Sequence, residues 1–237
     1  SDIAIGAARV MGVDLMKNFD QPHLSRSIGE FWRRWHISLM AWFRDYIYIP
    51  LGGSRHGRLN HYRNIAVVFL VSGVWHGAGG HYIVWGGVIA LYIMFGHATS
   101  DARERFAVAI GFDRLPRLRA VYQVVTAVGI NYTAFVFFRA PDMPTALHMY
   151  AQAFSGWGLL LDPGWWNEWL VRLGWSAGLF VFAMCLVPAT ELIEFRQRHL
   201  DRWKAPTALR WAGDWALIVG ALLFGVFTRE AFVYFQF

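Results

Sequence analysis

Three stretches of mostly apolar residues stand out in the second half of the chain, at 122–138, 173–187 and 211–227. Each is close to the lower limit of about 17 residues for a helix that crosses the hydrocarbon core of a bilayer. Trp and Tyr residues flank these stretches, and such residues extend a short span into the interface. We therefore predict a membrane-spanning helix at each of the three.

A longer apolar run at 65–96 contains no Lys, Arg, Asp or Glu. It is long for one helix and short for two complete spans. Its middle reads WHGAGGH, from Trp75 to His81, and a glycine cluster interrupts helices. The pattern predicts two helical arms joined by a bend, a broken or re-entrant hairpin. Such a bend is stable in a membrane only where protein or water covers the freed backbone groups.

Upstream of this hairpin, the segment 27–53 has the pattern of an amphipathic helix followed by a turn. Ser27 and Glu30 have the spacing of a capping box. Apolar residues then recur at helical spacing at positions 28, 31, 32, 35, 39, 42 and 43, with polar residues between them. Pro50 and the following glycines predict a turn. We expect 27–45 to form one helix that lies at the cytoplasmic interface of the membrane or dips into the protein.

The composition supports a membrane protein. Apolar residues make up 56% and charged residues 16% of the chain, whereas soluble domains have about 45–50% and about 25%. We therefore expect an all-α integral membrane protein, with residues 1–237 forming a single membrane domain. The lone cysteine, Cys185, excludes a disulfide framework and a cysteine-based zinc site, and we expect no metal.

The basic residues are concentrated in three loops. Residues 31–63 carry six Arg, 101–119 carry five Arg, and 191–210 carry four Arg and one Lys, whereas 139–173 carry only Arg139 and Arg172. Cytoplasmic loops of membrane proteins have such an excess. We therefore assign the net charge of +6 to membrane topology and expect no nucleic-acid partner.

Two histidines are the main candidates for chemistry. His76 lies in the uncharged run beside the predicted bend, where a titratable group is costly to desolvate and is usually functional. His36 borders the aromatic stripe of the amphipathic segment. Imidazole both takes and gives a proton near neutral pH. Each could instead have a structural role. His76 could hydrogen-bond to a neighbouring helix, and His36 could lie at the interface with one ring nitrogen in contact with water. Similarly, Arg33, Arg34 and Arg44 could stabilise an oxyanion or be ordinary border charges.

Several motifs together resemble one family of membrane enzymes. EFWRRWHISL at 30–39, WFRDYIYIPLGG at 42–53 and SGVWHGA at 72–78 are similar to the membrane-bound O-acyltransferase (MBOAT) family. The segments FFRA at 137–140 and FVYFQF at 232–237 are similar to its bacterial alginate O-acetyltransferase branch. The resemblance implies a multi-helix bundle around a tunnel. It also implies that the chain is the C-terminal portion of a longer protein.

By this resemblance, His76 is the principal catalytic residue and His36 the second. The substrate-binding candidates in the same motifs are Trp75, Gly77, Arg33, Arg34, Arg44 and Asp45. The implied enzyme is an O-acetyltransferase of the bacterial inner membrane, with several membrane passes. It moves acetyl groups from a cytoplasmic donor across the membrane for acetylation of an exported polysaccharide, alginate or similar.

Acetyl-CoA is the implied donor substrate, and no cofactor is expected to stay bound. Expected partners are the lipid bilayer and periplasmic acetyltransferase or carrier proteins. Two other functions stay open on the residues alone. A polytopic transporter could line its path with these histidines, although transporters usually carry internal repeats and none is visible here. A non-catalytic scaffold of a polysaccharide export complex would need neither histidine.

The loop charges predict a topology that can be tested. We expect residues 101–119 to face the cytoplasm and residues 139–170 to face the periplasm. Single cysteines introduced into these loops in a Cys185→Ser background would be probed in intact cells with an impermeant thiol reagent. Labelling is expected only at 139–170, and the opposite result would invert the scheme.

Overall fold

A computed structural model describes residues 1–155 and 162–172, together with scattered positions between 178 and 219. The chain divides into two units, Ser1–Trp165 and Trp166–Phe237, and the packing and the site described below belong to the first unit. All regular structure among the described residues is helical. Two helices there are long and apolar enough to cross a membrane, α5 (Gly80–Ala98) and α7 (Pro116–Arg139). Helix α7 contains the predicted span at 122–138, whereas those at 173–187 and 211–227 lie largely outside the described residues.

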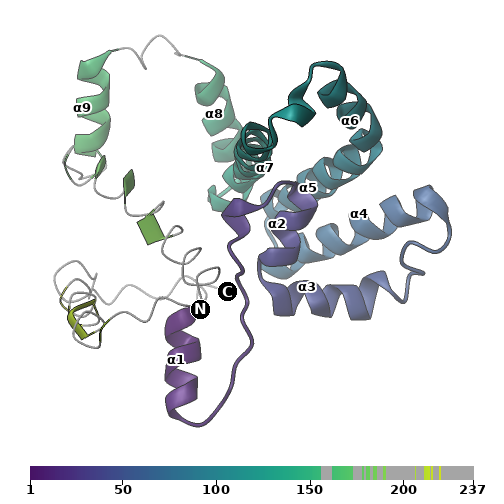
Figure 1. Ribbon diagram of the computed structural model, residues 1–237, viewed down its shortest axis with the longest axis horizontal. Coiled ribbons are helices and arrows are strands. Elements are labelled where there is room, and N and C mark those ends of the chain that lie inside the picture. Colours follow the sequence, from purple (N-terminus) through teal and green to yellow (C-terminus); the bar gives the residue numbers. More distant parts are fainter. Residues whose placement is uncertain are drawn as a thin grey trace. The chain divides into compact units, whose positions relative to one another are not determined.

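The apolar run forms a helical hairpin, as its glycine cluster predicts. Helix α4 (Gly57–His76) and α5 lie side by side, joined by a bend at 77–79 (Figure 1). At two places their backbones come so close that only glycine fits. A β-carbon on Gly73 would collide with the carbonyl oxygen of Tyr82, and one on Gly86 with that of Phe69. Small residues allow membrane helices to approach in this way.

A short helix, α2 (Ile28–Arg34), packs its aromatic face against the hairpin and α7. The buried ring of Trp32 lies 5.5 Å from that of Phe69 in α4 and 5.6 Å from that of Trp85 in α5, between ring centroids. It also stacks on Phe135 of α7 at 6.2 Å. Burial of large aromatic side chains contributes strongly to packing free energy. Trp32 thus joins three longer helices.

The predicted single helix over 27–45 is interrupted, and this part of the prediction is wrong. Helix α2 ends at Arg34, and α3 (Ile37–Phe43) begins after His36, which has a left-handed backbone with φ 49°. A π-helix, η2 (Arg44–Tyr48), follows. The capping box forms in part: the Glu30 N–H donates to Ser27 Oγ at 3.1 Å, but Glu30 Oε2 accepts from the N–H of Arg26, the residue before the N-cap, at 2.9 Å.

A buried asparagine fixes the turn that follows. The Nδ2 of Asn64, in α4, donates to the carbonyl oxygens of Leu51 at 3.2 Å and Gly53 at 2.8 Å. The remaining elements are listed in chain order. They are α1 (Asp2–Val10), η1 (Pro22–Leu24), α6 (Ser100–Ala109), η3 (Phe112–Arg114), α8 (Met143–Phe154) and α9 (Pro163–Arg172). An extended segment joins α1 to η1 (Figure 1).

The close approach of α4 and α5 predicts a difference between two adjacent glycines. Gly86→Ala should lower the free energy of unfolding in detergent by about 1–3 kcal/mol, because the methyl group meets the rigid backbone of Phe69. In the control, Gly87→Ala, the new methyl group makes an ordinary contact with Leu70 at 3.8 Å. The control should be neutral or slightly stabilising. Equal denaturation midpoints for both variants would contradict this account of the helix interface.

Candidate active site

His76 is the last residue of α4 and lies among aromatic rings from three helices. Its ring centroid is 4.6 Å from that of Trp75, 4.8 Å from Phe138 of α7 and 5.2 Å from Trp85 of α5. The imidazole is half-buried. The ends of α4 and α7 and the first turns of α5 therefore supply the rings that pack on this histidine.

His36 precedes α3 and lies close to the same place. Its ring centroid is 6.4 Å from that of Trp75, which also contacts His76, and a charge on His36 acts on His76. The structure thus brings the two predicted histidines together from different elements. Among the described residues, the buried Nδ1 of His36 has no hydrogen-bond partner. Burial lowers the pKa of His36, which favours the neutral imidazole that can accept a proton.

The charged candidates are engaged with nearby residues. Arg34 pairs with Glu30 at 2.6 Å. The Nε of Arg44 donates to Asp45 Oδ1 at 2.7 Å, and this exposed guanidinium lowers the pKa of the Asp45 carboxyl. Arg33 is exposed and acts electrostatically on His97. An oxyanion-stabilising or substrate-binding role for these charges stays a prediction.

The other two candidates lie directly beside His76. Trp75 is 50% exposed and contacts both histidine rings. Gly77 has φ 153° and ψ 166°, a backbone conformation that residues with a side chain rarely adopt. A β-carbon two residues later, on Gly79, would meet the ring of His81. The bend therefore depends on glycine for its own geometry.

Comparison with known proteins identifies the family. Residues 2–138, which contain both histidines, match the family model of the membrane-bound O-acyltransferases. The chain belongs to this family. It is 44% identical over 156 residues to a probable alginate O-acetylase of Pseudomonas putida, covering 65% of this chain and 30% of that protein.

Two further relatives show the same partial coverage. A probable alginate O-acetylase of Pseudomonas aeruginosa is 42% identical over 155 residues, covering 65% of this chain and 28% of that protein. The peptidoglycan O-acetyltransferase of Helicobacter pylori is 40% identical over 146 residues, covering 62% and 26%. The chain thus spans less than a third of the length of these relatives.

The structure adds residues to the candidate site of this membrane-bound O-acyltransferase that sequence reasoning missed. Trp85 and Phe138 pack on His76, and Phe19 packs on His36 with ring centroids 6.0 Å apart. None of them carries a chemical signal in the sequence. Trp85 and Phe138 stand near other aromatic residues in the sequence and Phe19 stands alone, and only the packing reveals which ring meets a histidine.

A second group of histidines lies outside the site. The Nδ1 of His61 is 2.6 Å from the hydroxyl of Tyr48, and its Nε2 is 3.3 Å from Nδ1 of His97. The two imidazoles stack with centroids 5.4 Å apart. This chain of hydrogen bonds links η2, α4 and α5. The three side chains therefore have a structural role in joining these elements.

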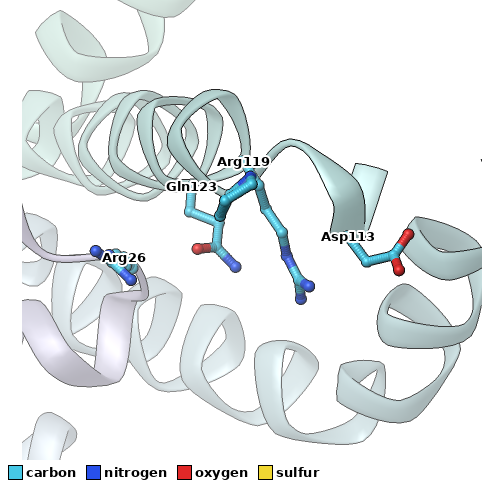
Figure 2. Close-up of a pocket in the computed structure, with 5 residues that line it drawn as sticks. Arg26, Asp113, Arg119 and Gln123 are labelled. Carbon is cyan, nitrogen blue, oxygen red and sulfur yellow. The ribbon is translucent and has the colours of Figure 1, made fainter. Parts of the chain in front are cut away.

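A cavity of about 320 Å³ lies near the predicted cytoplasmic loop 101–119. Arg26 lines it before α2, and Arg119 and Gln123 extend into it from α7 (Figure 2). Arg119 also donates to Glu104 at 3.1 Å, and this contact lowers the pKa of the Glu104 carboxyl. Neither His36 nor His76 lines this cavity, so it is separate from the candidate active site.

The geometry of the bend yields a prediction for Gly77. Gly77→Ala should lower the free energy of unfolding by about 1–3 kcal/mol, because the new β-carbon strains the backbone conformation at this position. Gly80→Ala is the matched control, since a β-carbon there meets open space. Thermal denaturation in detergent would compare the two. If Gly77→Ala unfolded at the same temperature as Gly80→Ala, the bend would not require glycine.

Proposed function

We propose that this chain carries the catalytic residues of an O-acetyltransferase that serves the acetylation of an exported polysaccharide. The observation that supports the proposal is the meeting of His36 and His76 at the ring of Trp75. The two histidines are far apart in the sequence and are placed by separate helices. Acyl transfer to a hydroxyl needs a base for the hydroxyl proton and a positioned group near the developing charge. Two imidazoles at one place can fill both roles.

In this proposal, His76 is the general base. Its imidazole takes the proton from the acceptor hydroxyl as the hydroxyl oxygen bonds to the acetyl carbonyl carbon. The bond between that carbon and the donor sulfur then breaks, and the leaving thiolate receives the proton from the imidazolium. The rings of Trp85 and Phe138 restrict the position of His76, which reduces the cost of orienting it for this step. His36 assists by polarising the carbonyl or orienting the acceptor.

The donor, the membrane location and the acceptor of the reaction are inferred from the charge pattern and from the relatives. The basic loops favour a cytoplasmic donor, for which we propose acetyl-CoA, and an inner-membrane location. The relatives named for alginate and for peptidoglycan support an acceptor pathway that ends on a polysaccharide outside the cytoplasm. We propose that a periplasmic acetyltransferase or carrier protein receives the acetyl group, either directly from this enzyme or in the next step of the pathway.

The two histidines should differ in their tolerance of asparagine. Asn can hydrogen-bond but cannot take a proton at neutral pH. His76→Asn and His76→Ala should therefore lower acetyl transfer by about 10²–10⁴-fold, the usual contribution of a general base. His36→Asn should keep measurable activity. Acetyl groups per polymer would be measured in cells, with the amount of protein in the membrane determined by immunoblot.

His56→Asn is the matched control, because His56 lies in an exposed turn before α4 and should leave activity unchanged. Wild-type activity in His76→Asn would refute the general-base assignment. Loss of the His76 variants from the membrane would instead assign His76 a role in folding.

A further inference from the structure

The backbone around His36 is held by a segment that precedes it by about twenty residues. The side-chain Oδ1 of Asn18 accepts a hydrogen bond from the Ser38 N–H at 2.9 Å. The backbone carbonyl of Asn18 accepts from the Ile37 N–H, also at 2.9 Å. On the other side of the break, the Asp20 N–H donates to the Arg34 carbonyl at 2.9 Å. These three bonds bracket Trp35 and His36.

His36 needs such support because its own backbone is unfavourable. A left-handed conformation in a residue other than glycine is strained and persists only where its surroundings enforce it. Within the described part of the chain, His36 and Gln21 are the non-glycine residues with positive φ, and both lie in this pair of segments. The strain is therefore confined to the place where the segment 18–21 meets the break between α2 and α3.

The capping of α3 points to the same residue. Helices usually begin with a Ser, Thr, Asp or Asn whose side chain accepts from an early backbone N–H. His36 occupies this position in α3 and forms no such side-chain bond. Asn18 supplies the missing acceptor from a remote part of the chain, so the imidazole of His36 is not used for capping. Next to Asn18, the ring of Phe19 packs on Trp35 at 4.9 Å and on His36 at 6.0 Å.

We propose that Asn18 is a positioning residue for His36. It holds the backbone of the break so that the imidazole stays beside Trp75 and His76, and it touches neither donor nor acceptor. The kinetic effects expected from this inference rest on the proposed function. The geometric role of Asn18 does not depend on it.

The kinetic experiment compares Asn18→Leu, Asn18→Asp and a matched control, Asn60→Leu, in the purified full-length protein. The side chain of Asn60 likewise forms one hydrogen bond to backbone, but as the donor, to the His56 carbonyl at 2.7 Å, away from the site. Asn18→Leu should lower kcat by about 10- to 100-fold, because a small displacement of a catalytic group has this cost. The KM for the acetyl donor should stay within about twofold, because a transition-state interaction is lost. Asn18→Asp retains an acceptor oxygen and should restore most of kcat, and Asn60→Leu should resemble wild type.

A double-mutant cycle separates positioning from general stability. If Asn18 acts through His36, then Asn18→Leu should cause little further loss in a His36→Ala background. The same fold-loss in both backgrounds would overturn the proposal. Loss of Asn18→Leu from the membrane, with Asn60→Leu retained, would also overturn it, because Asn18 would then support the fold as a whole.

A chemical measurement tests the geometry without any enzymatic activity. Diethyl pyrocarbonate acylates accessible, neutral imidazole nitrogens, and peptide mass spectrometry gives the rate for each histidine. Asn18→Leu should raise the rate at His36 several-fold over wild type while the rate at His56 stays constant. An unchanged rate at His36 would refute the positioning role. If the wild-type protein transferred no acetyl groups, the proposed function would be refuted instead. The labelling rates would still decide the role of Asn18.

Discussion

The contact between α4 and α5 through Gly73 and Gly86 is the constraint on which the rest of the site depends. Backbones that approach this closely fix the rotation and register of the two helices, because a shift would bring side chains into the contact. This register puts Trp85 beside His76 and leaves a face on which Trp32 of α2 packs. Helix α7 then closes the cluster with Phe135 and Phe138.

Two asparagines hold the irregular backbone on either side of α3. Asn64 donates to the turn at Leu51 and Gly53, and Asn18 accepts from the first turn of α3. A buried backbone polar group without a partner is costly, and more so where water is scarce. Breaks in helices near a membrane therefore need polar side chains from elsewhere in the chain. In this protein the bonds of Asn18 also hold the backbone on which His36 lies.

Much of the fold follows from local sequence, but the break at Trp35 and His36 does not. The glycine cluster and the apolar runs predicted the hairpin and α7 because length, hydropathy and helix propensity are local properties. The apolar spacing continues across Trp35 as if the helix did too, and the residue that bonds to the backbone at the break, Asn18, is remote in sequence. Likewise His36 and His76 could be named from their chemistry, whereas Trp85 and Phe138 become neighbours of His76 only through helix packing.

Both histidines lie where a helix stops, and this placement suits a transfer reaction. A side chain in the middle of a helix is flanked by the turns on either side of it, so large substrates approach it from one direction. His76 ends α4 and is followed by glycines at 77, 79 and 80, in the bend that leads into α5. His36 stands before the first turn of α3. The bend that allows the hairpin to close thus also places His76 at the end of its helix, and the break in the amphipathic segment brings the second imidazole to the same place.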